Sequence, residues 1–297
     1  MTELSGAAAK HLNYIQRLAS ERMESLGDVI VGSGSFCDET WSVDLHSCYG
    51  PSGQDKEANQ DFAVGWMSHD PNGEICWAVA IADGVTASSY SAAGSRLACW
   101  SALNALLDDM STPRDSAWHA VDAAGEAIGT IFEMLTAEGK ESIPDGEVDG
   151  DWKFRLRRGR LLQTTLMLAW VTRAGAYCVA VIGDGGAQVQ RAKDIETMTD
   201  VSFETNRVHA LGPLNRRVEE LDCWAEFPSS TIRRGALFTD GVSKGLHTTS
   251  REIFTELDQL GEHSQDANSA ADLIADWIRK DAKAFDDNLT LVVARSK

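Results

Sequence analysis

Two long helical patterns lie next to each other in the middle of this chain, with strand-like segments before and after them. Apolar residues recur at helical spacing in residues 88–110 and, after the break at Pro113, in residues 115–139. Two consecutive helices are unlike a fold that alternates single strands with single helices. The pattern therefore predicts an α+β fold, and layered sheets flanked by helix pairs would bury these elements best.

The other elements predicted from hydrophobic periodicity are mostly strands. The turn signal at residues 70–74, Asp-Pro-Asn-Gly-Glu, separates two of them and predicts a hairpin. Helices are predicted at residues 5–26, before the main domain, and at residues 267–283, before the last strand. Residues 32–35, Gly-Ser-Gly-Ser, are interpreted as a loop. The strands are predicted at residues 41–50, 61–69, 75–83, 164–173, 176–192, 223–230, 235–242 and 285–295.

Composition narrows the class of protein. The chain has 297 residues, 43% of them apolar, which is enough for one large domain or two small ones. No apolar stretch is long enough to span a membrane, and the N-terminus lacks the pattern of a secretory signal. The six cysteines form no Cys-x-x-Cys pair and are interpreted as buried thiols rather than as disulfides or zinc ligands. Free thiols are typical of the reducing cytoplasm, so we expect a cytoplasmic protein. The formal net charge of −18 argues against nucleic acid or an anionic membrane as a partner.

Aspartate recurs where the apolar strand segments end. Asp83, Asp184 and Asp240 each follow such a segment and precede a glycine. Asp61 and Asp287 each come just before a segment of the same kind. Asp and Gly also suit turns, so a single copy of this pattern does not distinguish a turn from a ligand. If the strands share one sheet system, the recurrence predicts that several carboxylates converge at one edge.

A cluster of carboxylates calls for cations, because like charges within about 4–6 Å strongly disfavour joint ionisation. Oxygen ligands without an accompanying His or Cys indicate Mg²⁺ or Mn²⁺ rather than zinc. Two such ions about 3.5–4 Å apart hold phosphate oxygens and generate a nucleophilic water. The residues themselves thus suggest hydrolysis of a phosphoryl ester. Asp286 is interpreted as a turn residue or a partner of a ligand, since its side chain and that of Asp287 point in opposite directions on an extended segment.

The ordered set of motifs resembles that of the metal-dependent protein phosphatase family, type 2C, across residues 40–295. Lys-Glu-Ala-Asn-Gln-Asp at 56–61 is similar to the family's Arg-x-x-Asn-(Glu/Gln)-Asp, and Ala-Asp-Gly-Val at 82–85 stands in the place of its Asp-Gly-His-Gly-Gly. Gln-Thr-Thr at 163–165 resembles Gly-Thr-Thr, and Gly-Asp-Gly-Gly at 183–186 resembles Gly-Asp-Ser-Arg. Thr-Asp-Gly-Val at 239–242 and the Asp-Asn-Leu-Thr that ends at residue 290 complete the series.

This resemblance implies a four-layer α-β-β-α sandwich of two antiparallel sheets flanked by helix pairs. Residues 1–35 would form an N-terminal helical extension and loop, and residues 36–297 the phosphatase domain. The nucleophile would be a water activated at a binuclear Mg²⁺ or Mn²⁺ site, Lys56 would bind phosphate, and a third ion would bind more loosely. By motif position the implied metal ligands are Asp83, Asp240 and Asp287 at the core, the Gly84 carbonyl on the second ion, Asp61 directly or through water, and Asp184 on the third ion.

The implied substrate is phosphoserine or phosphothreonine in a protein. The resemblance also leads us to expect a monomeric enzyme and a cognate Ser/Thr kinase as a partner. Two departures separate the chain from the family pattern: Lys56 replaces an arginine, and Val85 replaces a histidine that serves as a candidate acid in some members. Lysine lacks the bidentate fork of arginine. These departures indicate a divergent, bacterial-like branch. They also keep two alternatives open, an inactive pseudophosphatase that acts as a binding module and a hydrolase of small phosphoesters.

Overall fold

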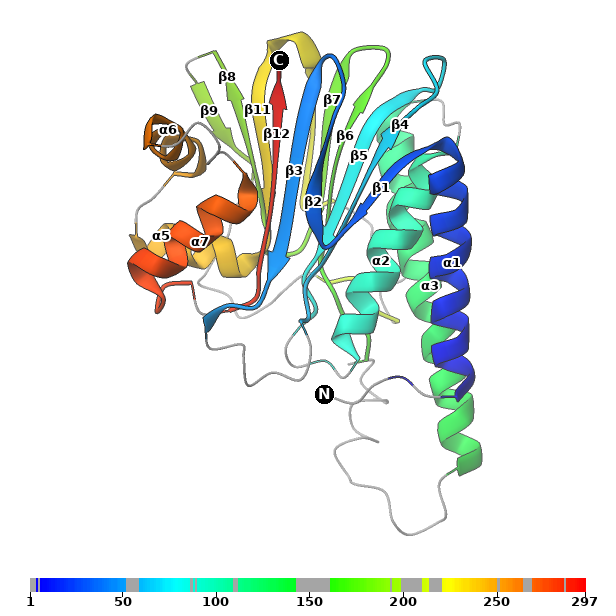
Figure 1. Ribbon diagram of the computed structural model, residues 1–297. Helices are drawn as coiled ribbons and strands as arrows, with labels where there is room; N and C mark the ends of the chain where they lie inside the picture. Colours follow the sequence, from blue (N-terminus) through cyan, green and yellow to red (C-terminus); the bar gives the residue numbers. More distant parts are fainter. Residues whose placement is uncertain are drawn as a thin grey trace.

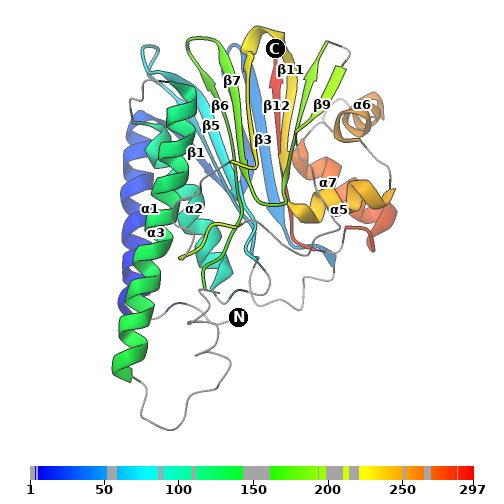
Figure 2. The same cartoon turned by 180° about the vertical axis from the view of Figure 1, so that it is seen from behind.

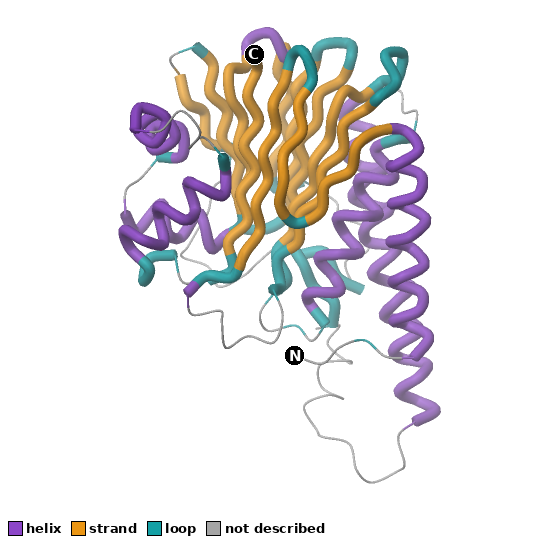
Figure 3. The backbone as a smooth tube through the Cα atoms, viewed as in Figure 1, coloured by secondary structure: helices purple, strands orange, loops and turns teal. Residues whose placement is uncertain are grey.

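Two six-stranded sheets stack face to face at the centre of the molecule in the computed structural model (Figure 3). All strand pairs in both sheets are antiparallel. The structure describes residues 4, 6–51, 59–85, 88, 90–108, 112–142, 161–192, 194–198, 210–213, 221–249, 252–263, 269–285 and 287–297. The predicted antiparallel sandwich is confirmed.

The first sheet contains the hairpin predicted from the turn signal at residues 70–74, since its second and third strands pair directly. In spatial order its strands are β1 (Gly27–Val31), β4 (Phe62–Ser68), β5 (Ile75–Ala82), β6 (Leu166–Thr172), β7 (Ala176–Ile182) and β10 (Cys223–Pro228).

The second sheet is built from both ends of the chain, and β12, the last strand, lies in its interior. In spatial order its strands are β2 (Ser33–Cys37), β3 (Trp41–Cys48), β12 (Leu289–Ser296), β11 (Ile232–Phe238), β8 (Gly186–Arg191) and β9 (Asp194–Thr197). A short 3-10 turn, η2 (Ser229–Thr231), joins β10 to β11 and carries the chain from one sheet to the other.

Helices cover both outer faces of the sandwich and complete the four predicted layers (Figures 1 and 2). The first sheet is covered by α1 (Gly6–Leu26), α2 (Ser91–Leu106) and α3 (Pro113–Ser142). The second is covered by α5 (Asp240–Thr249), α6 (Ile253–His263) and α7 (Ala270–Asp281). The two consecutive long helices expected from the sequence are α2 and α3, whereas α5 and α6 were not predicted. None of the described helices has the length and apolar character that crossing a lipid bilayer requires.

The four central strands of the first sheet, β4 to β7, are apolar on both faces because both faces are buried. In β5, Ala78 and Ala80 contact the helical layer, while Trp77 and Val79 face the second sheet. Alternate side chains point to opposite faces of a strand, so a strand covered on both sides reads as one continuous apolar run. This is the origin of the run Cys-Trp-Ala-Val-Ala-Ile-Ala that precedes Asp83.

The loop predicted at residues 32–35 is wrong for three of its four residues. Ser33, Gly34 and Ser35 belong to β2, and only Gly32 lies in the turn, with φ +74°. That left-handed conformation favours glycine. The β1–β2 hairpin gives one strand to each sheet, and α1 is tied to the first sheet by the Trp66 indole N–H, which donates to the Met23 carbonyl at 3.0 Å. The division of the chain at residue 36 stays a prediction.

Candidate metal centre

The first sheet brings two of the predicted aspartates to one rim of the sandwich. Asp61 directly precedes β4, and Asp83 directly follows β5. In an antiparallel pair, the start of one strand lies beside the end of its neighbour, and Phe62 is indeed paired with Ala82. The hairpin therefore places the two carboxylates next to each other without any contribution from distant segments.

The second sheet delivers three more aspartates to the same rim. Asp240 is the first residue of α5, two residues beyond the end of β11, and Asp287 lies two residues before β12. These two strands are paired, and the Thr239 N–H donates to the Thr290 carbonyl at 3.1 Å. Asp184 lies in the connection from β7 to β8, one of the points where the chain passes between the sheets.

The carboxylates come within ligand distance of one another. Oxygen atoms of Asp83, Asp184 and Asp240 all lie within 4.8 Å of each other, and no other such group of three occurs among the described Asp, Glu, His and Cys residues. Asp83 is also close enough to Asp61 and Asp240 for carboxyl–carboxyl hydrogen bonds. Burial, followed by the negative charges of Asp61 and Asp240, raises the pKa of Asp83 well above its ordinary value. Burial and the Asp240 carboxylate likewise raise the pKa of Asp184.

Asp61 is held from one side only. Its Oδ2 accepts hydrogen bonds from the hydroxyls of Thr239 at 2.8 Å and Thr290 at 3.0 Å. Its Oδ1 is fully buried, and no donor among the described residues reaches it. Burial raises the pKa of Asp61 to about 6. A buried carboxylate oxygen without a donor is costly unless a cation binds it, so this oxygen-only set of side chains fits a hard divalent cation such as Mg²⁺ or Mn²⁺.

Threonines also fix the backbone at Asp83. The Thr165 N–H donates to the Asp83 carbonyl at 2.9 Å, and the Thr164 hydroxyl donates to the same oxygen at 2.8 Å. The next residue, Gly84, donates its N–H to the Gln60 carbonyl at 3.1 Å and forms an isolated bridge with Thr164. The contribution of the segment Gln-Thr-Thr that these contacts show is to hold the backbone of Asp83 and Gly84 in place.

Lys244 places a positive charge inside this cluster. Its ammonium group is ion-paired with the Asp240 carboxylate and lies 4.0 Å from Asp287 Oδ2. The sequence gives a signal for this contact, because residues four apart face each other on a helix. The signal applies only to a helix, and the sequence pattern predicts a strand over residues 235–242, so it does not predict this ion pair.

The five predicted aspartates, Asp61, Asp83, Asp184, Asp240 and Asp287, therefore lie at one rim, although their roles as metal ligands stay predictions. Two other predicted residues, Lys56 and Asp286, lie outside the described residues. The functional side chains that sequence reasoning missed are Thr239, which holds Asp61, and Lys244.

We expect the Gly241→Ala variant to be destabilised by about 1–3 kcal/mol, because it would insert a methyl group into a tight contact between α5 and the segment that precedes β12. A Cβ at Gly241 would lie 2.1 Å from the Asn288 backbone oxygen and 3.2 Å from the Asp287 Cβ. The inserted methyl group would push Asp287 away from Asp240. Urea unfolding and Mn²⁺ titration measure the two effects.

The matched control is Gly73→Ala, in the β4–β5 turn, where a Cβ would meet no atom closer than 3.4 Å. This variant is expected to change stability by no more than about 0.5 kcal/mol. Equal stability and equal Mn²⁺ affinity for Gly241→Ala and Gly73→Ala would show that the contact between α5 and the segment before β12 does not position Asp287.

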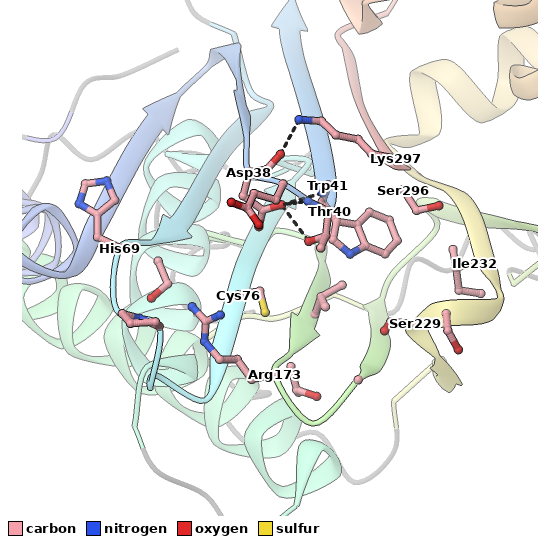
Figure 4. A pocket seen from close by; sticks show the side chains of 17 residues that line it. Asp38, Thr40, Trp41, His69, Cys76, Arg173, Ser229, Ile232, Ser296 and Lys297 are labelled. Carbon is pink, nitrogen blue, oxygen red and sulfur yellow. Dashed lines mark hydrogen bonds between the residues drawn. The ribbon is translucent and has the colours of Figure 1, made fainter.

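A hollow of about 800 Å³ lies at the opposite end of the sandwich (Figure 4). It is lined by Trp41, Cys76, Arg173 and Ser229, among others. Trp41 pairs with Ser296 at the far end of β12 from Asp287. The hollow and the carboxylates thus lie at different ends of the sandwich, and the rim with the carboxylates is the candidate site on chemical grounds.

Comparisons with known proteins bear on the fold and the family of this chain. No curated protein sequence matches the chain at a significant level. Among solved structures, the catalytic domain of the serine/threonine protein phosphatase PstP in complex with two manganese ions shares 20% identity, covering 86% of this chain and 98% of that one, with a TM-score of 0.55. PppA of Pseudomonas aeruginosa, described as a key regulatory component of T6SS, shares 16% identity over 89% of this chain and 100% of that one, with a TM-score of 0.54.

A third similar structure is RsbX in complex with magnesium, at 11% identity over 90% of this chain and 100% of that one, with a TM-score of 0.52. At these identities the likenesses show the shared fold. The family itself is shown by a sequence profile described as "Protein phosphatase 2C", which matches residues 52–279. Because that match covers more than half of the chain, the protein belongs to the protein phosphatase 2C family, whose members are metal-dependent.

Proposed function

We propose that the protein hydrolyses phosphoserine or phosphothreonine in proteins at a binuclear Mn²⁺ or Mg²⁺ centre on this rim. The observation that carries the proposal is Asp61 Oδ1, a buried oxygen without a donor that lies beside the carboxylates of Asp83 and Asp240. PstP, a relative of the same fold, has been solved with two manganese ions, and RsbX with magnesium. The oxygen-only side chains of this rim suit either ion.

The proposed ligands follow the motif positions: Asp61, Asp83, the Gly84 carbonyl, Asp240 and Asp287, with Asp184 beside them. Two bound cations supply a nucleophilic water at neutral pH and neutralise the phosphate oxygens. The chain's own residues set the geometry for that chemistry.

Thr239 and Thr290 hold one oxygen of Asp61, so its other oxygen faces the cluster. Thr164 and Thr165 hold the backbone at Asp83. The Asn288 N–H donates to Asp287 Oδ1 at 2.8 Å and orients that carboxylate. Asp61, Asp287 and the backbone at Asp83 are thus positioned before any cation binds, which lowers the cost of assembling the site.

Val85 favours a second candidate function, that of a pseudophosphatase that binds phosphoproteins without cleaving them. It follows Gly84 where some family members carry a histidine, and an apolar side chain cannot protonate a leaving group. Its backbone N–H donates to the Gln163 carbonyl at 3.0 Å, so the chain path at this point is fixed. In the active enzyme that we propose, the leaving oxygen would be protonated from water or from another side chain.

Removal of divalent cations is expected to abolish hydrolysis of both p-nitrophenyl phosphate and a phosphothreonine peptide. Addition of Mn²⁺ to the EDTA-treated protein should restore both activities, because without cations the rim does not activate a water and its carboxylates repel the phosphate. Release of p-nitrophenol and of inorganic phosphate measures the two reactions. Circular dichroism before and after EDTA treatment shows whether the fold persists.

Three results would contradict the proposal in different ways. Mn²⁺ binding without hydrolysis of any substrate would identify the pseudophosphatase. Hydrolysis of sugar phosphates or nucleotides in preference to phosphopeptides would identify a hydrolase of small phosphoesters. Hydrolysis that persists unchanged in EDTA would exclude the metal-dependent mechanism. The proposal also expects a cytoplasmic monomer that acts opposite a Ser/Thr kinase, with no nucleic acid or membrane as partner.

A further inference from the structure

Lys244 is the basic side chain that α5 inserts among the carboxylates of the rim. It lies four residues after Asp240, and this spacing brings the two side chains onto one face of the helix. The ammonium group contacts Asp240 and lies 4.0 Å from Asp287 Oδ2, so it connects the start of α5 to the segment that precedes β12. About half of the Lys244 side chain is exposed, whereas only 11% of the Asp240 side chain is.

A third carboxylate acts on the same ammonium group. Partial burial lowers the pKa of Lys244, but the negative charges of Asp240, Asp287 and Asp184 outweigh that effect and raise the pKa above its ordinary value. Asp184 in turn belongs to the group whose oxygens lie within 4.8 Å of one another. A lysine side chain that is about half exposed is a cation at neutral pH, and Lys244 contacts Asp240, which belongs to the same group of oxygens as Asp184.

The charge of the cluster explains why a fixed cation is useful there. Five aspartates carry five negative charges when all are ionised. Two divalent cations neutralise four of these charges, and the Lys244 ammonium neutralises the fifth. A third divalent cation would leave the cluster with an excess of positive charge, and it would have to bind close to an ammonium group that repels it.

We propose that Lys244 is a built-in cation of the metal centre, which takes the place of a further divalent ion beside Asp184, Asp240 and Asp287 and so limits the centre to two ions. The inference rests on the proposed metal centre and specifies its composition. Because the lysine is part of the chain, the charge that it contributes does not depend on the concentration of free metal.

The experiment compares Mn²⁺ binding to the full chain and to its Lys244→Met variant, by isothermal titration calorimetry and by electron paramagnetic resonance of the free ion. We expect the unmodified protein to bind two ions. Lys244→Met is expected to bind a third, or to bind Mn²⁺ at least about tenfold more tightly, because one positive charge close to the ions has been removed. Lys244→Gln should behave like Lys244→Met, and Lys244→Arg, which keeps the charge, should behave like the unmodified protein.

Lys280→Met is the matched control. Lys280 on α7 is ion-paired with Asp276, also four residues away, at 2.6 Å, and its side chain is exposed to a similar degree, 44% against 49% for Lys244. Loss of this lysine should leave the number and affinity of Mn²⁺ ions unchanged. The inference is overturned if Lys244→Met and Lys244→Gln, shown by circular dichroism to be folded, bind the same number of ions with the same affinity as the unmodified protein. It is also overturned if Lys280→Met shifts Mn²⁺ binding equally, or if neither the unmodified protein nor Lys244→Met binds Mn²⁺.

Phosphatase activity is measured separately and tests a different claim. A protein that binds two ions, gains a third in Lys244→Met and hydrolyses no phosphoester would refute the proposed function and support the role of Lys244. A protein that hydrolyses phosphopeptides with unchanged Mn²⁺ binding in Lys244→Met would support the function and refute the role of Lys244.

Discussion

The Asp83→Asn variant is expected to hydrolyse a phosphothreonine peptide about a thousandfold more slowly than the unmodified protein, or slower still. Divalent cations contribute several kcal/mol to such reactions, and each 1.4 kcal/mol corresponds to about a factor of ten in rate. Asp83 is in contact with Asp61 and Asp240 and shares the 4.8 Å group with Asp184. An amide in its place keeps the shape of the side chain and removes the charge that a cation needs.

The same variant should remain folded, and thermal unfolding provides the check. In EDTA, Asp83→Asn is expected to unfold at the same temperature as the unmodified protein or at a higher one, because one of several repelling carboxylates is gone. In Mn²⁺ the order should reverse, since a ligand that binds only the native state raises its stability and the variant binds the ion more weakly.

Asp44→Asn is the control for Asp83→Asn. Asp44 lies in β3, is also half-buried, and has Arg295 as its partner at 3.7 Å. This substitution should leave hydrolysis nearly unchanged. Full activity of Asp83→Asn in Mn²⁺, or an equal loss of activity in Asp44→Asn, would show that the rim carboxylates have no specific part in hydrolysis.

Replacement of Trp77 by alanine is expected to lower the free energy of unfolding by about 3–5 kcal/mol, the largest effect on stability that we predict. Trp77 is fully buried between the sheets. Its ring centroid lies 5.5 Å from that of Trp41 in the second sheet and 5.9 Å from that of Tyr177 in the first. The variant would leave a cavity in the layer that joins the two sheets, and urea unfolding measures the loss.

Two further tryptophan variants separate packing from polarity. Trp77→Phe should lose much less stability than Trp77→Ala, because the indole N–H is buried without an acceptor among the described residues and its removal relieves that cost. Trp118→Ala, on the partly exposed side of α3, should also lose less. A loss for Trp77→Ala no greater than that for Trp118→Ala would contradict the view that the inter-sheet aromatic cluster holds the sandwich together.

Some elements were beyond sequence-based prediction because their own residues favour them weakly. Helix α5 contains Gly241 and Gly245 and ends in two threonines, all of which are poor helix formers. It is stabilised instead by the burial of Val242 and Leu246 in the core beneath the second sheet. Strand β2 likewise has a single buried side chain, Phe36, in a segment of serine and glycine. In both cases tertiary packing outweighs local propensity.

The sequence by itself determined the sandwich class and the five aspartates, because strands that are buried on both faces leave continuous apolar runs and an acidic residue stands at one end of each of these five runs. It could not determine which strand ends share a rim, since that depends on pairing between β11 and β12, which are separated by three helices in the chain. Only the tertiary structure placed the Thr239 and Thr290 hydroxyls on one oxygen of Asp61 and left its other oxygen without a donor. Only the tertiary structure turned Lys244 toward the carboxylates, because that contact requires a helix that exists through packing rather than through the preferences of its own residues.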